Sequence, residues 1–190
     1  MSRLAIPGAV LVLVLVLGGC GNSRTPVPNL QPPAPPGAVV QLRYPAYGIS
    51  LRVPSNWVQE GAGAPLLATV SSGKAVVALW SYRRAAPPPA GMAGLALARV
   101  RLIAATERRD RSLRLIHAKL IQVDHHAGVE LDALERIAGQ PRRVRSVHVF
   151  TRHAEVVLDA YAPPEIFHPV DHDVFSPLKR SLRLQSSTAA

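Results

Sequence analysis

The sequence predicts an α+β domain in which helices pack on a mainly antiparallel sheet. From about residue 39 the chain is a series of short segments with alternating or β-branched residues, separated by brief turn signals. Such short gaps favour antiparallel neighbours. Two stretches with helical periodicity interrupt and then end the series, near residues 92–109 and 170–184.

The first 19 residues are predicted to be an export signal rather than part of this domain. Arg3 provides a positive n-region, residues 9–17 provide the apolar h-region, and the segment ends in Leu-Gly-Gly-Cys. The apolar run is too short to span a membrane as a helix, which takes about 20 residues. Cleavage is expected between Gly19 and Cys20.

Residues 17–20 resemble the lipobox of bacterial lipoprotein precursors, with Leu three positions before the cysteine and small residues between them. The resemblance implies a thioether-linked diacylglyceryl group on Cys20 and a protein held on the extracytoplasmic face of the cell membrane or envelope. Two or more acyl chains suffice for stable anchoring. Cys20 is the single cysteine, so no intramolecular disulfide is expected. The alternative is a conventional secretory signal in which Cys20 is incidental.

Residues 20–38 are predicted to form a disordered, proline-rich tether. They show no apolar periodicity, and each proline favours extended backbone. At about 3.1 Å per residue, roughly 18 residues reach up to about 55 Å. A proline-motif ligand is the alternative to a plain spacer. The prolines are at positions 26, 28, 32, 33, 35 and 36.

A single α+β domain is expected over residues 39–185. Tyr47, Ile49, Leu51 and Val53 alternate in a half-buried strand, and Trp57 after it is expected to cover one end of the core. Further strands are predicted, in order, at residues 66–70, 75–82, 113–117, 119–123, 128–137, 142–151 and 156–161.

Two helices complete the prediction. The first follows three consecutive prolines and covers residues 92–109, with Ala93, Leu97, Val100 and Ile103 as its apolar face. The second begins near Pro169 or Val170 and ends near residue 184, with a kink at Ser176–Pro177. Residues 186–190 are small and polar, and we expect them to be frayed.

Two segments resemble the Mog1/PsbP-like domains. Residues 47–57 (YGISLRVPSNW) look like the first strand of that family, and residues 160–163 and 175–182 look like its last strand and C-terminal helix. The resemblance implies an α/β/α sandwich that binds partners and has no catalytic machinery. The long proline-rich tether and the excess of arginine are not part of the family pattern.

The chain is strongly basic, with a net charge of +10. Removal of residues 1–19 takes away only Arg3, which leaves +9. Such a charge favours anionic partners, and an arginine-rich composition or solvated strand edges are the alternative explanations. Nucleic acid is not expected, because few aromatic residues accompany the arginines. A candidate anionic-surface patch comprises Arg108, Arg109, Arg111, Arg114, Arg142, Arg143 and Arg145.

Catalytic, metal and cofactor sites are not predicted. There is no G-x-S-x-G motif, and the one thiol is committed to lipid. Adjacent His125 and His126, and the pair His168 and His172, lack the spacing of a metal-binding motif. Glu130, Asp132 and Glu135 are interpreted as one exposed strand face.

The predicted function is therefore a non-catalytic, membrane-tethered binding or accessory domain. Its candidate partner is a protein or an anionic envelope component. The alternative is a carrier of an amphiphilic ligand in a cleft between sheet and helix. An enzyme is favoured only if the fold places His148 or His153 beside a carboxylate in a cleft.

Overall fold

The computed structural model describes residues 31–185. The predicted signal peptide, Cys20, the tether up to residue 30 and the tail 186–190 lie outside the described residues. Within residues 31–185, no helix has the length and hydropathy needed to cross a membrane.

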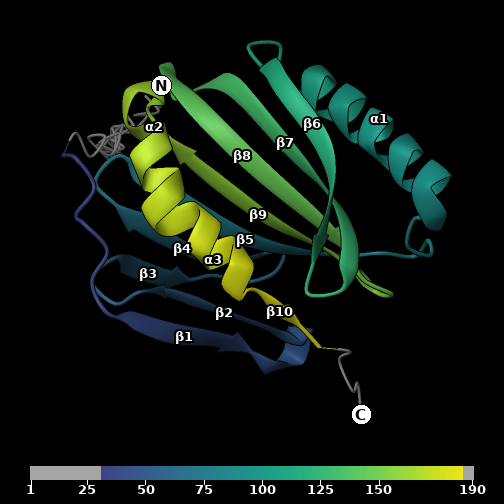
Figure 1. Ribbon diagram of the computed structural model, residues 1–190, viewed down its shortest axis with the longest axis horizontal. Helices are drawn as coiled ribbons and strands as arrows, with labels where there is room; N and C mark the ends of the chain where they lie inside the picture. Colours follow the sequence, from purple (N-terminus) through teal and green to yellow (C-terminus); the bar gives the residue numbers. More distant parts are fainter. Residues whose placement is uncertain (1–30, 186–190) are drawn as a thin grey trace, which may run out of the picture.

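Two antiparallel sheets form the framework (Figure 1). The smaller has the order β1-β2-β10, and the larger has the order β3-β4-β5-β9-β8-β7-β6. The smaller sheet comprises β1 (Val39–Tyr44), β2 (Ile49–Pro54) and β10 (Arg183–Leu184). The larger comprises β3 (Val58–Gly61), β4 (Leu66–Ser72), β5 (Ala75–Arg83), β6 (Arg114–Val123), β7 (His126–Ile137), β8 (Gln140–Phe150) and β9 (Ala154–Ala162).

The strand alternation of the sequence separates the two faces of the larger sheet. One face packs against the smaller sheet and the C-terminal helix and contains most of the core, including Trp57, Val77 and Phe167. The other face carries a second apolar cluster around Val129 and Phe150, beneath α1 (Gly91–Arg109). Figure 1 shows α1 and the C-terminal helix on opposite faces of this sheet.

The buried face of α1 differs from the predicted one. Leu97 and Val100 are 49% and 57% exposed. Leu95 is instead buried, and Leu102 is half-buried against the same apolar cluster. The helix has alanine and leucine around most of its circumference, so two sets of apolar residues have the spacing of a buried helix face. Contact with the sheet determines which set is buried. Leu95 is the one fully buried residue of this 19-residue helix.

The C-terminal helix begins earlier and ends earlier than predicted. It consists of α2 (Pro164–Val170), a π-helical turn (Asp171–Phe175) and α3 (Ser176–Ser181). Pro164, not Pro169, occupies the first turn, where proline is favoured because its missing N–H has no helical partner. The chain then becomes extended and adds β10 to the smaller sheet.

The two strands predicted at residues 113–117 and 119–123 are one strand, β6. A β-bulge between Leu115 and His117 shifts its register with β7. Because the bulge changes the alternation of the sequence locally, the pattern indicates two strands where the backbone forms one.

Residues 31–38 differ from the expected disordered tether, because they lie against the domain as an extended strap. The Ala34 N–H donates to Ser72 Oγ at 2.9 Å, and the Trp57 indole donates to the Ala34 carbonyl at 3.2 Å. Asn56 accepts from the Gly37 N–H at 2.8 Å and donates to the Pro35 carbonyl at 2.9 Å. The extended backbone that proline favours leaves its carbonyls free to accept such bonds.

Replacing Asn56 with alanine is expected to release the strap. Two hydrogen bonds are lost, each contributing roughly 1 kcal/mol, so amide exchange at Gly37 should accelerate by about tenfold or more. Hydrogen–deuterium exchange measures this directly. Ser55→Ala, at the neighbouring exposed position, is the matched control and should leave the rate unchanged. Equal protection of Gly37 in the wild-type protein and in Asn56→Ala would contradict the role assigned to Asn56.

Candidate functional site

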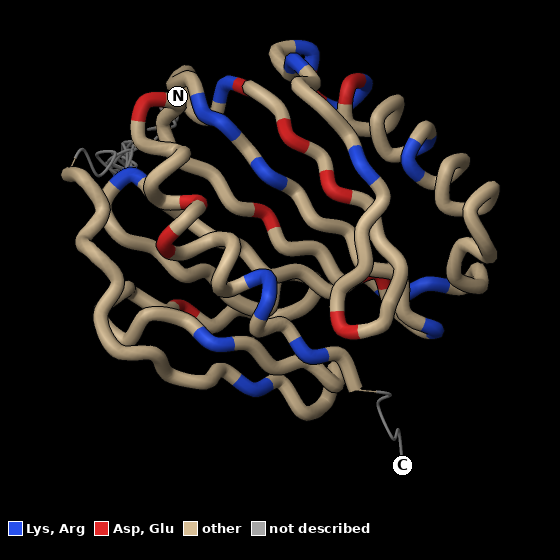
Figure 2. The backbone as a smooth tube through the Cα atoms, in the orientation of Figure 1, with Lys and Arg blue, Asp and Glu red and all other residues tan. Residues whose placement is uncertain are grey.

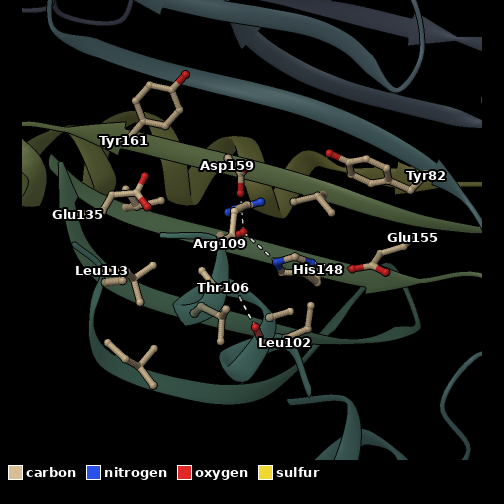
Figure 3. Close-up of a pocket in the computed structure, with 17 residues that line it drawn as sticks. Tyr82, Leu102, Thr106, Arg109, Leu113, Glu135, His148, Glu155, Asp159 and Tyr161 are labelled. Carbon is tan, nitrogen blue, oxygen red and sulfur yellow. Dashed lines mark hydrogen bonds and ion pairs between the residues drawn. The ribbon is translucent and has the colours of Figure 1, made fainter. Parts of the chain in front are cut away.

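A pocket of about 290 Å³ lies between α1 and the larger sheet (Figure 3). This volume is at the lower end of the range for small-molecule sites, roughly 300–1,000 Å³. Much of its wall is apolar, with α1 covering side chains from β6 to β9. The apolar lining comprises Leu102, Ala105, Leu113, Leu115, Leu131, Ala133, Val144 and Val157.

A line of polar side chains crosses the sheet side of the pocket. Ser146 and His148 are on the same face of β8, and Ser146 lies opposite Asp159 of β9 in the ladder. The Ser146 hydroxyl donates to Asp159 Oδ1 and lies 3.0 Å from His148 Nε2. His148 Nδ1 in turn lies 2.7 Å from Glu155 Oε1. Figure 3 shows Asp159, His148 and Glu155 along this wall.

The charge of Glu155 is balanced within the protein. Burial by itself would raise the pKa of Glu155, but the hydrogen bond from His148 and the charges of His148 and Arg84 outweigh it and lower the pKa. Arg84 Nη1 lies 3.2 Å from Glu155 Oε2. Glu155 therefore stays ionised at neutral pH.

Asp159 and Glu135 are in the opposite situation. Burial raises the pKa of Asp159, and the Ser146 hydrogen bond and the more distant charges of His148 and Arg109 do not offset it. Burial and the nearby charge of Asp110 raise the pKa of Glu135. Both carboxyls line the same pocket and form no ion pair among residues 31–185.

The structure divides the predicted arginine patch. Arg108, Arg109, Arg111 and Arg114 are exposed at the end of α1 and the start of β6. This loop does reach the end of β7, since the Arg136 N–H donates to Ser112 Oγ at 2.9 Å. Arg109 also lines the pocket.

Arg143 and Arg145 belong instead to a buried ion network on the opposite face. Their guanidinium groups lie 2.8 Å and 3.2 Å from Asp132 Oδ2 and stack on the Phe167 ring. Asp132 and Glu130 are 0% and 1% exposed, so the expectation of an exposed acidic face was wrong for these two residues. Figure 2 shows the acidic positions of β7 between basic positions of β6 and β8.

Lysines complete this network. Lys179 Nζ of α3 lies 2.6 Å from Glu130 Oε2, and Lys119 Nζ of β6 lies 3.0 Å from Glu130 Oε1. Burial alone would raise the pKa of Glu130 and Asp132, yet the hydrogen bonds from these lysines and from the arginines lower both. The hairpin register, which pairs Asp132 with Arg145, was the signal in the sequence that could have revealed the network.

The histidines considered as metal ligands in the sequence are not brought together. His125 is exposed in the β6–β7 turn, His168 is exposed on α2, and His172 contacts its neighbour Asp173 at 2.7 Å. Among residues 31–185 no group of three or more potential metal ligands comes together. Of the two histidines that the sequence left open, His148 does lie beside a carboxylate in the pocket.

Comparison with solved structures shows a PsbP-like fold, as the sequence predicted. The solution structure of cyanobacterial PsbP (CyanoP) from Synechocystis sp. PCC 6803 matches with a TM-score of 0.58 and 11% identity, covering 89% of this chain and 99% of that chain. LpqN of Mycobacterium tuberculosis, involved in cell envelope biogenesis, matches with a TM-score of 0.55 and 15% identity, covering 80% and 86%.

A protein of Bacteroides thetaiotaomicron VPI-5482 matches with a TM-score of 0.52 and 10% identity, covering 77% of this chain and 48% of that chain. No family model matches the sequence. No curated protein matches it either.

Asp159→Asn is expected to stabilise the protein at high pH. A carboxyl whose pKa is raised on folding stabilises the native state below its unfolded pKa, and this contribution is lost as pH rises through the folded value. Asparagine keeps an acceptor for Ser146 without the charge. The melting temperature of the variant relative to wild type should therefore increase more at pH 8 than at pH 4, measured by calorimetry.

Glu60→Gln, at an exposed position of β3, is the control and should give the same melting temperature as wild type at both pH values. If Asp159→Asn lowered the melting temperature equally at both pH values, the carboxylate would not be a source of strain.

Proposed function

We propose that this chain is a lipid-anchored extracytoplasmic protein whose domain binds a small amphiphilic ligand without catalysis. The pocket beneath α1 carries this proposal, because it combines an apolar wall with a line of polar groups. Of the two binding functions that the sequence left open, the pocket favours the ligand carrier over a purely protein-binding accessory domain.

The anchor is proposed from the lipobox that ends at Cys20. The likeness of fold to LpqN, a protein of cell envelope biogenesis, agrees with a location in the envelope. Because residues 31–38 lie against the domain, we expect them to add nothing to the reach of the predicted tether. At about 3.1 Å per residue, these eight residues would otherwise add roughly 25 Å.

A hydrolase is the second candidate, because Ser146, His148 and Glu155 are arranged as nucleophile, base and acid are in a catalytic triad. Two observations count against it. The Ser146 hydroxyl donates its hydrogen bond to Asp159 and not to His148. Strand β8 is also paired along both edges at Ser146, so its backbone N–H groups are committed to the ladder and form no oxyanion hole.

The anchor is tested with Cys20→Ser. The wild-type protein should partition into the membrane fraction and carry the extra mass of acyl chains. The variant should lack this mass and appear in the soluble fraction or as unprocessed precursor. Equal intact masses and equal sedimentation of the two proteins would refute the anchor. Ser23→Ala, three residues further on, is the control and should behave as wild type.

Binding is tested on the mature chain, residues 20–190 with Cys20→Ser, by titration with n-octanol. The NMR methyl signals of Leu131 and Ala133 should shift with saturation. Ala133→Leu fills part of the pocket and should weaken binding by about tenfold or more, whereas Ala93→Leu on exposed helix surface should not. Unshifted methyl signals would contradict the proposal. Covalent labelling of Ser146 by a fluorophosphonate would favour the hydrolase instead.

A further inference from the structure

The pocket is acidic although the protein is basic. Its lining contains Glu135, Glu155 and Asp159, against Arg109 and His148 as the basic groups. The whole chain, in contrast, has a net charge of +10. The sign of charge inside the pocket is thus opposite to that of the chain as a whole.

Among the described residues, only one of the three pocket carboxylates has its charge balanced by the protein. Glu155 pairs with Arg84 and His148. Asp159 accepts a hydrogen bond from the neutral Ser146 hydroxyl and lies near the neutral Trp80. Two carboxylates in the pocket therefore remain without a partner cation in this part of the chain.

Glu135 is the second of these. Arg142 lies opposite it in the ladder but donates to the carbonyl of Pro141 at 3.3 Å instead. Arg109, at the end of α1, acts on Glu135 and Asp159 only at a distance and forms no ion pair with either among residues 31–185.

The other face of the same sheet shows that the chain supplies cations where a buried carboxylate needs them. Glu130 is contacted by two lysines and an arginine, and Asp132 by two arginines. Asp159 and Glu135 lack such cations, so we expect a bound ligand to supply the positive charge.

Tyr161 lies close enough to both carboxylates to be affected by their charges. It lies two residues after Asp159 on the same face of β9, and its hydroxyl experiences the charges of both Asp159 and Glu135. Figure 3 shows Tyr161 and Glu135 toward one end of the pocket and Asp159 nearer its middle, close to His148. Two carboxylates and an aromatic ring are the groups that bind an organic ammonium, through charge-assisted hydrogen bonds and cation–π contact.

We propose that the ligand of this pocket is a primary amine with a short hydrocarbon part, whose ammonium group is attracted by the uncompensated charges of Asp159 and Glu135. The inference rests on the proposed function and names its ligand class. An ammonium has three donors on a compact centre, so it can pair with one of the two carboxylates while the charge of the other adds to the attraction. The hydrocarbon part lies on the apolar wall formed by Leu102, Leu131 and Val144.

The size and polarity of the pocket limit the ligand. At about 30 Å³ for each water-sized group, 290 Å³ holds roughly ten non-hydrogen atoms, so a chain of about eight carbons fits. A carboxylate head would be repelled by the two uncompensated acidic side chains, and a bare metal ion would leave the apolar wall without contact. A neutral hydroxyl head would leave both carboxylates unpaired.

The experiment compares n-octylamine, n-octanol and octanoate on the mature chain carrying Cys20→Ser, by calorimetric titration at pH 8. Octylamine should bind at least about tenfold more tightly than octanol, and octanoate more weakly than octanol. Asp159→Asn and Glu135→Gln should each reduce octylamine affinity by about tenfold, so that the preference for octylamine over octanol falls. Glu165→Gln is the matched control and should change neither.

The outcomes separate the two proposals. Equal affinity for octylamine and octanol, or octylamine binding that survives both pocket substitutions, would overturn the ammonium site and leave the amphiphile pocket standing. Absence of binding by all three compounds would overturn the proposed function itself. A cooperative thermal unfolding transition of Asp159→Asn and Glu135→Gln, measured by circular dichroism, shows that a lost amine response does not come from misfolding.

Discussion

The rest of the structure depends on how buried carboxylates are compensated on one face of the larger sheet. Glu130 and Asp132 are almost fully buried on β7, where an unpaired ion would cost several kcal/mol. Arg145 links three carboxylates there, Asp132, Glu130 and Asp171, and so ties β7 and β8 to the π-helical turn. Lys179 adds a contact from α3. The network places the C-terminal helix on this face and leaves the other face to α1.

The α1 face is built differently, and its function follows from that difference. α1 buries only Leu95 fully, so it covers the sheet without filling the space beneath its second half. Asp159 and Glu135 line this space without a partner cation among residues 31–185. Groups that raise the free energy of the native state are typical of binding sites, because a ligand that pairs with them recovers the lost interaction.

Much of the fold could be predicted from the sequence, because strand alternation and short turns determine an antiparallel sheet locally. The opening strand before Trp57 and the ending around Phe175 also indicated the PsbP-like architecture. Three features could not be obtained in this way. The strap depends on side chains such as Asn56 that are distant in sequence, the buried face of α1 depends on contact with the sheet, and the burial of Asp132 depends on cross-strand register. A ligand pocket was predicted only as the alternative to a protein-binding accessory domain. Its polar wall could not be predicted, because it depends on the pairing of Ser146 with Asp159 on adjacent strands.

One sheet thus carries compensated carboxylates on one face and uncompensated ones on the other. Carbon-13 NMR titration of the side-chain carboxyl groups in the ligand-free protein distinguishes the two sets. Asp132 and Glu130 should titrate below their ordinary pKa values, and Asp159 and Glu135 above them. If Asp159 and Glu135 titrated at or below ordinary values, cations of the protein would already balance them, and the pocket would have no unmet charge for a ligand to neutralise.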